Sequence, residues 1–215
     1  MKKTSSSILL SLAILLMFSC SKRPVQTIEN LKTAVNGEST ASAKYAAFAV
    51  KAQEEGYDTI AVLFRAASKS EAVHAFNHKR ILDSLDASDY VAKIDTIIVL
   101  STEENLNTAL NGEAYEVATM YPGFIETGRS EKCAAGVKTF TWASIAERKH
   151  YDFYKRAIAV IATKAETSLP AHWFVCPTCG NTYDDTYVTA VCEICMTKPD
   201  EFINFEIALS AEVIK

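Results

Sequence analysis

Glycine and proline are scarce in this sequence, with 7 and 5 residues respectively in a chain of 215. All-β proteins need many tight turns, and tight turns depend on these two residue types. The sequence also lacks an excess of positive charge, since 22 Lys and Arg stand against 26 Asp and Glu. The first shortage favours long helices, and the second argues against nucleic acid as a partner.

The apolar run near the N-terminus, residues 8–18, is too short to cross a bilayer as a helix, which takes about 20 residues. It follows Lys2 and Lys3, and this order is typical of a secretory signal peptide. Residues 16–20 (Leu-Met-Phe-Ser-Cys) resemble a bacterial lipobox, in which Cys20 becomes the lipidated first residue. We therefore expect a signal peptide at 1–19, a polar tether at 20–26 and an exported lipoprotein, anchored in the inner or outer membrane and facing the periplasm. A plain cleaved signal with an incidental cysteine is the alternative.

Residues 27–165 show helical periodicity, because apolar side chains recur three and four positions apart. We expect helices from residue 27, from about 59 to 85, from 101 or 102 to about 127, and from about 130 to 162. A connector at 86–97 separates the second from the third, and Pro122 should kink the third. Helices of this length predict an all-α four-helix bundle with one long crossover.

Two short motifs occur twice at nearly the same offset. Asn-Gly-Glu at 36–38 returns at 111–113, and Glu-x-x-His at 71–74 returns at 147–150. Residues three apart on a helix share a face. One Glu from each of two helices plus Glu-x-x-His from each of the other two is the ligand pattern of di-iron carboxylate bundles. The repeat therefore indicates a duplicated metal site.

Carboxylates and neutral imidazoles suit iron, and a bridging carboxylate can hold two ions together. Acids on solvated helix faces are the alternative, but small apolar residues surround Glu38 and precede Glu147. A fifth acid, Glu116, shares the face of Glu113. Five buried carboxylates without cations would be strongly destabilising. The repeated motifs supply the candidate ligands Glu38, Glu71, His74, Glu113, Glu147 and His150.

The composition changes after a linker at 166–171. Residues 172–215 form a tail too small to hold a core without a metal or disulfides. It carries Cys-x-x-Cys at 176–179 and again at 192–195. Two such pairs can close a tetrahedral all-sulfur site for iron or zinc, formed by Cys176, Cys179, Cys192 and Cys195. Two disulfides are the competing interpretation.

With both parts in view, the chain resembles rubrerythrin over essentially its whole length after the leader. The resemblance implies a ferritin-like di-iron domain at 27–165, followed by a small metal-stapled rubredoxin-like domain of strands and loops at 172–215. It implies that Glu38, Glu71, Glu113, Glu147 and His150 bind iron. It further implies that Glu116 and His74 exchange as ligands of one iron, and that Tyr45 and Tyr121 hydrogen-bond the carboxylates.

The activity that the resemblance implies is the reduction of hydrogen peroxide to water in oxidative-stress defence. Electrons would pass from an unknown donor protein through the four-cysteine iron to a non-haem di-iron centre. The family also suggests a head-to-tail homodimer in which one subunit's thiolate centre serves the other's di-iron site. A ferritin-like ferroxidase or iron-handling protein, and a zinc-stapled envelope protein without enzymatic activity, are the alternatives.

The sequence departs from the family pattern near the second cysteine pair. Met196 stands where the family usually has glycine or another small residue, and Glu193 stands where it has proline. Two other residues look uninvolved in the chemistry. We expect His78 to be a solvated neighbour of charged residues and Cys133 to be a small buried apolar residue.

Overall fold

The computed structural model describes residues 23–85, 87–163, 168–186 and 189–207. The expected signal peptide, Cys20 and the first part of the tether lie outside these residues. Within them, no helix is both long and apolar enough to cross a bilayer.

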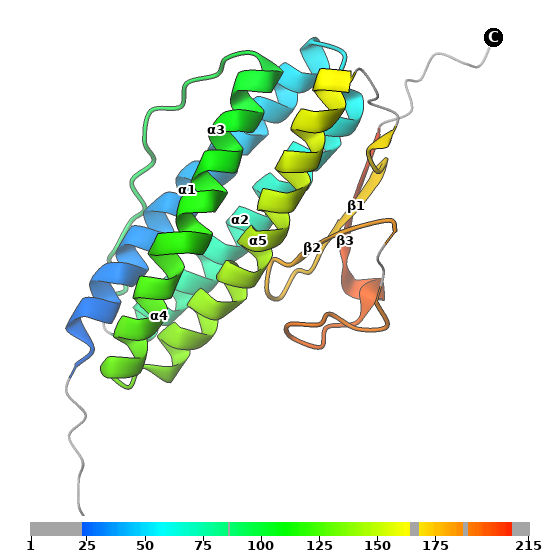
Figure 1. Cartoon of the computed structure of the whole chain (residues 1–215). Helices are drawn as coiled ribbons and strands as arrows, with labels where there is room; N and C mark the ends of the chain where they lie inside the picture. Colours follow the sequence, from blue (N-terminus) through cyan, green and yellow to red (C-terminus); the bar gives the residue numbers. More distant parts are fainter. Residues whose placement is uncertain (1–22, 86, 164–167, 187–188, 208–215) are drawn as a thin grey trace, which may run out of the picture.

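The bundle is built from long antiparallel helices, as Figure 1 shows. A crossover at 87–101 runs along the outside of the bundle and returns the chain to the opposite end. The predicted four-helix bundle with one long connection is therefore confirmed, its third helix being formed by α3 and α4 in succession. The helices are α1 (Val25–Glu54), α2 (Asp58–Ser84), α3 (Thr102–Tyr115), α4 (Tyr121–Ser130) and α5 (Ala134–Thr163).

The third helix is interrupted by a π-helical turn, Glu116–Met120, between α3 and α4. The sequence predicted a kink at Pro122, and the irregular turn lies just before that residue. A proline ring collides with the carbonyl four residues earlier, which here belongs to Ala118 inside the widened turn. The π turn thus accommodates the proline.

The last helix begins at Ala134, later than the predicted start near residue 130. Lys132 adopts a left-handed backbone conformation with φ of 58°. A residue in this conformation ends a helix and turns the chain, so α4 and α5 are separated by a short loop.

Two apolar clusters fill the bundle, one towards each end. One contains Leu31 of α1, Leu82 of α2 and Phe140 of α5, and the other contains Phe48 and Phe64 with aromatic neighbours. On α1, α2 and α5 alike, the acidic motif lies between a segment in one cluster and a segment in the other. The core is therefore divided by a polar layer at mid-height.

The C-terminal part forms a small lobe beside the bundle (Figure 1). Its sheet has the order β2-β1-β3 with both pairings antiparallel, and a 3-10 turn, Pro199–Glu201, precedes the last strand. Trp173 of the lobe joins the bundle's apolar cluster and meets Phe153 at 4.6 Å between ring centroids. The strands are β1 (His172–Val175), β2 (Thr182–Asp184) and β3 (Ile203–Glu206).

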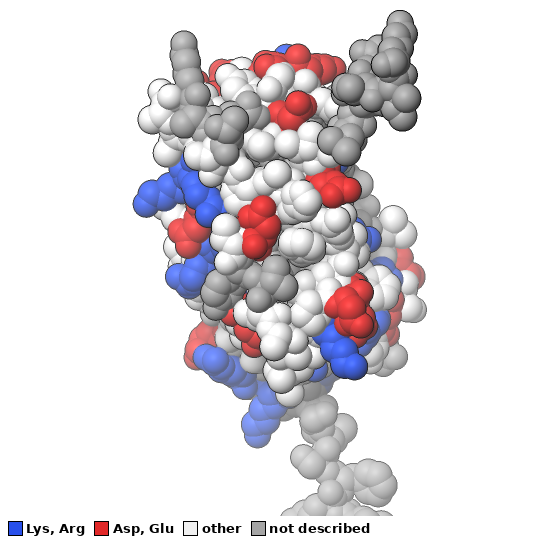
Figure 2. Space-filling model, turned by 90° about the vertical axis from the view of Figure 1, so that its right-hand side faces the viewer, with Lys and Arg blue, Asp and Glu red and all other residues white. Residues whose placement is uncertain are grey.

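The molecular face on the lobe side carries acidic and basic side chains scattered among uncharged ones, as Figure 2 shows. A nucleic-acid interface would gather positive charge into a continuous stripe. On this face acidic side chains lie between the basic ones.

Candidate metal centres

The polar layer brings the two copies of the repeated motif together. Their ligand atoms form two overlapping groups, each with all its atoms within 4.8 Å of one another. All the side chains involved are at most 2% exposed. One group consists of Glu38, Glu71, His74 and Glu147, and the other of Glu71, Glu113, Glu147 and His150.

Glu71 and Glu147 belong to both groups, and each divides its two oxygens between them. His74 Nδ1 lies 3.0 Å from Glu71 Oε2 and 2.7 Å from Glu147 Oε1. His150 Nδ1 lies 3.0 Å from Glu71 Oε1 and 2.7 Å from Glu147 Oε2. This pseudo-twofold arrangement is that of two carboxylates bridging two adjacent ions.

The charges in the layer are far from balanced by the protein alone. Burial, followed by the nearby carboxylates Glu116 and Glu147, raises the pKa of Glu38 well above its usual value. Burial, followed by Glu147 and Glu71, does the same to the pKa of Glu113. The shared Glu71 differs, because His150 and His74 outweigh its burial and lower its pKa.

Several buried atoms of the layer have no hydrogen-bond partner, although buried polar groups are normally paired. These atoms belong to residues of the two ligand groups, and their number and type suit two cations. The residues present therefore fit a di-iron centre. The unpartnered atoms include Glu38 Oε2, Glu71 Oε1, Glu113 Oε2, both carboxylate oxygens of Glu147 and Nδ1 of His150.

Glu116 lies apart from both groups. It opens the π turn and is only partly buried, and none of its atoms belongs to either set of ligand atoms. Burial, followed by Glu147 and Glu71, still raises its pKa well above the usual value. The structure thus has His74, and not Glu116, among the atoms of the ligand group that contains Glu38.

Tyr45 and Tyr121 each donate a hydrogen bond to a carboxylate of the layer. Tyr45 Oη lies 2.6 Å from Glu113 Oε1. Tyr121 donates its hydroxyl to Glu38 Oε1. Because both phenols enter from the apolar clusters, they fix the outer carboxylates from opposite ends of the layer.

The expectation that His78 is solvated is wrong, since its side chain is fully buried. His78 Nε2 lies 3.1 Å from the hydroxyl of Tyr121, and Nδ1 lies 3.0 Å from Oγ1 of Thr139 on α5. Burial, followed by the charge of His74, lowers the pKa of His78 to about 3, so the ring is neutral at neutral pH. The one signal in the sequence was its position, one helical turn beyond His74.

Tyr154 was also missed. It is fully buried one turn beyond His150 and packs edge-on against Tyr45, with 5.6 Å between ring centroids. Burial, followed by the charge of Glu113, raises the pKa of Tyr154 well above its usual value, so the phenol keeps its proton. The expectation for Cys133 is met, because this thiol is buried and free.

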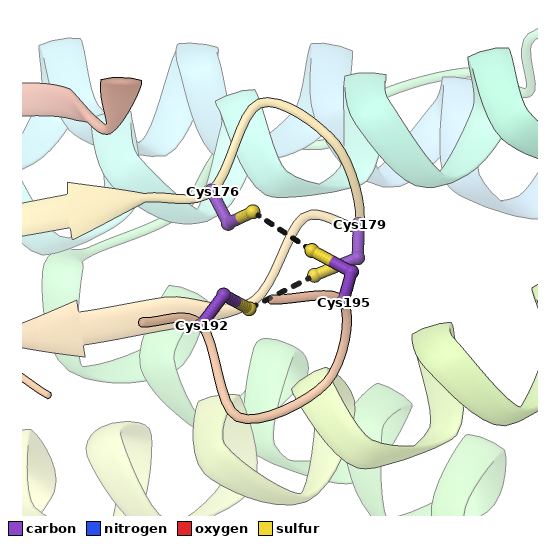
Figure 3. Close-up of side chains that lie close together, drawn as sticks. All are labelled: Cys176, Cys179, Cys192 and Cys195. Atoms are coloured by element: carbon purple, nitrogen blue, oxygen red, sulfur yellow. Dashed lines mark hydrogen bonds between the residues drawn. The ribbon is translucent and has the colours of Figure 1, made fainter. Parts of the chain in front are cut away.

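The four cysteines of the lobe converge from two loops, as Figure 3 shows. Cys176 Sγ lies 3.4 Å from Cys195 Sγ, and Cys179 Sγ lies 3.5 Å from Cys192 Sγ. All four are free thiols, which excludes the disulfide alternative for them. Their sulfur atoms lie within 4.8 Å of one another, as a tetrahedral all-sulfur metal site requires.

The thiols of this cluster cannot all ionise without a cation. Hydrogen bonds from Cys176 and Cys179 lower the pKa of Cys192, whereas contacts with Cys176 and Cys192 raise the pKa of Cys179. Cys192 is thus stabilised as a thiolate by its neighbours, whereas Cys176 and Cys179 resist deprotonation. A metal ion would hold all four as thiolates.

The two cysteine loops have the same backbone form. Gly180 N donates to the carbonyl of Cys176, and Met196 N donates to the carbonyl of Cys192. The residue directly after the second cysteine of each loop has a left-handed backbone, with φ of 83° at Gly180 and 67° at Met196. The departure noted in the sequence therefore places a methionine where glycine is conformationally preferred.

The family model described as Rubrerythrin matches residues 29–158, more than half of the chain. The chain belongs to the rubrerythrin family. Its buried carboxylate layer and its four-cysteine cluster are the ligand sets of the di-iron and four-cysteine iron centres of such proteins. This chain is accordingly a di-iron oxidative-stress protein of the rubrerythrin family.

Individual relatives agree over nearly the whole length. The rubrerythrin-family chain is 34% identical to nigerythrin from Nitratidesulfovibrio vulgaris over 176 residues, which cover 82% of this chain and 85% of that protein. It is 31% identical to Rubrerythrin-2 from Clostridium acetobutylicum over 189 residues, which cover 86% of this chain and all of the relative.

Solved structures support the same family assignment and fold. The fully reduced, all-ferrous state of nigerythrin matches with a TM-score of 0.75, covering 83% of this chain and 86% of that one at 34% identity. A bacterioferritin from Desulfovibrio desulfuricans matches with a TM-score of 0.63 at 17% identity, covering 69% of this chain and 87% of the other. The second likeness concerns the fold alone.

Proposed function

We propose that this protein reduces hydrogen peroxide to water, using two electrons and two protons for each peroxide. The observation that carries the proposal is the pair of shared carboxylates, Glu71 and Glu147, which present one oxygen to each of two adjacent ligand groups. Ferrous ions held there would supply the two electrons that cleave the O–O bond, and an iron held by the four thiolates would return them one at a time.

The chain's own residues have separate tasks in this proposal. Glu71 and Glu147 hold the two ion positions at a fixed separation, while Tyr45 and Tyr121 orient the outer carboxylates Glu113 and Glu38. The apolar clusters on either side exclude bulk water from the layer. We also propose that Glu116 takes the place of His74 as a ligand in the other oxidation state.

The four-cysteine lobe is the entry point for electrons in this proposal. Its four sulfur ligands fill a tetrahedral site, so peroxide has no position at which to bind there. The reductant that restores it would be a one-electron donor protein. From the leader sequence we further propose export and lipidation at Cys20, with anchoring in the inner or outer membrane facing the periplasm. From the family resemblance we propose assembly into homodimers.

Metal analysis and a peroxide assay test the proposal together. We expect about three irons per chain, two in the bundle and one in the lobe, and consumption of peroxide when a reduced donor is supplied. Zinc without iron would reject the enzymatic proposal. Iron accumulation well above this ratio, without peroxide consumption, would favour the ferritin-like alternative.

The variant Glu71→Ala separates the two centres, because it removes one shared carboxylate and leaves the lobe intact. We expect loss of peroxide turnover by at least about a hundredfold, with the visible spectrum of the thiolate-bound iron retained. Glu126→Ala, on the exposed face of α4, is the matched control and should keep full turnover. Undiminished turnover in the Glu71 variant would contradict the role of Glu71.

A further inference from the structure

Four exposed cations gather at the end of the bundle where α1 begins. Arg80 lies in the last two turns of α2, Arg129 in the last turn of α4, and Lys138 in the second turn of α5. Lys132 belongs to the turn between α4 and α5. In Figure 2, blue side chains lie at this lower end of the molecule. We call these four residues the basic end.

The cations of the basic end line two open hollows that share Lys138. The first lies between α2 and α5, has a volume of about 210 Å³ and is also lined by Arg80 and Trp142. The second lies over the turn between α4 and α5 and is also lined by Arg129 and Lys132. Among the described residues, no acidic side chain lines either hollow. Both hollows therefore suit a negatively charged group.

The acids nearest to the basic end in sequence are engaged elsewhere. Asp83 Oδ1 lies 2.5 Å from Lys79 Nζ. Glu131 accepts the backbone amide of Thr27 at 2.7 Å. In the part of the chain that the structure describes, none of the four cations forms an ion pair with a carboxylate. The positive charge at this end is therefore available to a partner.

The start of the described chain lies at the same end. Glu131, in the turn between α4 and α5, accepts the backbone amides of Gln26 and Thr27, so this turn lies against the beginning of α1. In the sequence, two residues separate Cys20 from Arg23, the first described residue. Three residue steps span at most about 11 Å. A lipid on Cys20 would therefore keep this end of the bundle, which is about 45 Å long, at the membrane surface.

We propose that the basic end is a docking surface for anionic phospholipid headgroups. The inference rests on the export and lipidation at Cys20 proposed above, and it does not depend on peroxidase activity. The phosphate groups of the lipid carry the charge that the four cations attract. Trp142, whose ring centroid lies 4.6 Å from Lys138 Nζ, adds an amphipathic ring of the kind favoured at the boundary between lipid and water. The lipid anchor and the basic end act together as two membrane-binding signals.

Docking at the basic end makes the bundle stand upright on the membrane. Along α1, Glu38 lies about 20 Å from Val25, the first residue of the helix. The carboxylate layer is thereby held above the headgroups, where water-soluble reactants reach the protein.

Vesicle co-sedimentation tests the basic end without iron, peroxide or a lipid anchor. The probe is the full mature chain from residue 20 with Cys20→Ser, mixed with vesicles of equal parts phosphatidylglycerol and phosphatidylcholine. We expect binding at least about tenfold tighter than to vesicles of phosphatidylcholine alone, and weaker binding as the salt concentration rises. Equal binding to the two kinds of vesicle, or no binding to either, would overturn the inference.

A matched pair of double variants locates the binding surface. Arg129→Gln combined with Lys132→Gln should weaken binding to the anionic vesicles at least about tenfold. Lys51→Gln combined with Lys155→Gln removes the same charge near the opposite end of α1 and α5 and should bind within about twofold of the wild-type protein. Thermal melting verifies that both variants are folded. Equal losses in the two variants would mean that net charge alone drives binding, which contradicts a docking surface.

Two rival explanations have their own tests. The crossover exposes Ile94 and Ile98, at 58% and 69%. Loss of vesicle binding in Ile94→Ser combined with Ile98→Ser, with full binding in the Arg129 and Lys132 variant, would place the membrane contact on the crossover and overturn the inference. Inorganic phosphate that binds the protein when the anionic vesicles do not would identify a site for soluble anions instead, with the same consequence.

The proposed lipidation is tested separately. Mass spectrometry of the N-terminal peptide, from protein isolated from cell membranes, shows whether Cys20 carries a lipid. An unmodified Cys20 would reject the lipidation proposal, whereas the vesicle measurements decide on the docking surface whatever that result. The two failures are therefore distinguishable.

Discussion

Met196 has the left-handed φ of 67° and a side chain that is 68% exposed. Left-handed backbone costs about 1–2 kcal/mol for a residue with a Cβ, and this exposed side chain gains little from packing. Met196→Gly should therefore stabilise the metal-loaded lobe by about 1 kcal/mol, seen as slower release of metal to a chelator. Met196→Ala retains the Cβ and is the control, since equal gains in both variants would mean that backbone strain is not the cause.

His78 is a buried residue whose two ring nitrogens both have partners, Tyr121 and Thr139. His78→Ala removes packing and leaves the two hydroxyl groups without this partner, so we expect a loss of about 2–4 kcal/mol in the free energy of unfolding. Denaturant titration measures the change. His172→Ala is the matched control in an exposed position and should change stability by less than about 0.5 kcal/mol. Equal effects in the two variants would contradict the role of His78.

The residues of the carboxylate layer could be found from the sequence because their motif is local, with acid and imidazole three positions apart on one helix. His78, Tyr154 and Thr182 could not be found in this way. Their importance depends on partners in other elements: Tyr121 for His78, Tyr45 for Tyr154 and His150 for Thr182. A one-dimensional pattern carries no record of such contacts.

Among the elements, α1 has an unusual N-terminus, because its cap comes from the loop before α5. Glu131 accepts hydrogen bonds from the backbone amides of Gln26 and Thr27 at 3.0 and 2.7 Å, and from the Thr27 hydroxyl at 2.6 Å. Glu131→Ala should lower the free energy of unfolding by about 1 kcal/mol. Glu126→Ala, in the exposed part of α4, is the control and should have little effect.

The same cap should depend on pH. Burial pushes the pKa of Glu131 upwards, but the hydrogen bonds from Thr27 and Gln26 outweigh it and leave the pKa below its ordinary value of 4.5. The contribution of Glu131 is therefore present above about pH 4.5 and is lost as the pH falls through the folded-state pKa. The stability difference between wild type and Glu131→Ala, measured from pH 7 to 3, should shrink towards the acid end. A constant difference would contradict this account.

The helices themselves were largely predictable, since the 3.6-residue apolar period is strong in α1, α2 and α5. The π turn was not, because nothing in the composition of residues 116–120 distinguishes a widened turn from a regular one. The late start of α5 depends on the backbone of Lys132, whose side chain type gives no warning of a positive φ.

For the whole molecule, the raised pKa values of Glu38 and Glu113 have a consequence for metal loading. The metal-free layer binds protons, which cations must displace. Adding ferrous ion to the metal-free protein at pH 7 should release protons and raise the melting temperature. Calorimetry in two buffers of different ionisation heat measures the release, and Glu38→Gln should reduce it. Binding without proton release would contradict the pKa directions.

The placement of the lobe was beyond what the sequence could show. Its composition and cysteine spacing predicted a metal-stapled unit, and the helical period predicted the bundle. The contact between them joins Ser70 to Gly180, 110 positions apart, through a glycine that looks like any turn residue in one dimension. Only the folded chain reveals that this glycine makes room for an imidazole.

The π turn also lets the helix hold one residue more between Glu113 and Tyr121 than a regular helix would hold. Because a π turn closes with about one residue more than an α turn, the helix after it keeps nearly the same faces. Deleting one residue from Glu116–Met120 would therefore give a regular helix and leave Tyr121 facing Glu38. Deleting one residue from the regular helix α3 would instead rotate everything after it by about 100° and carry Tyr121 away from Glu38.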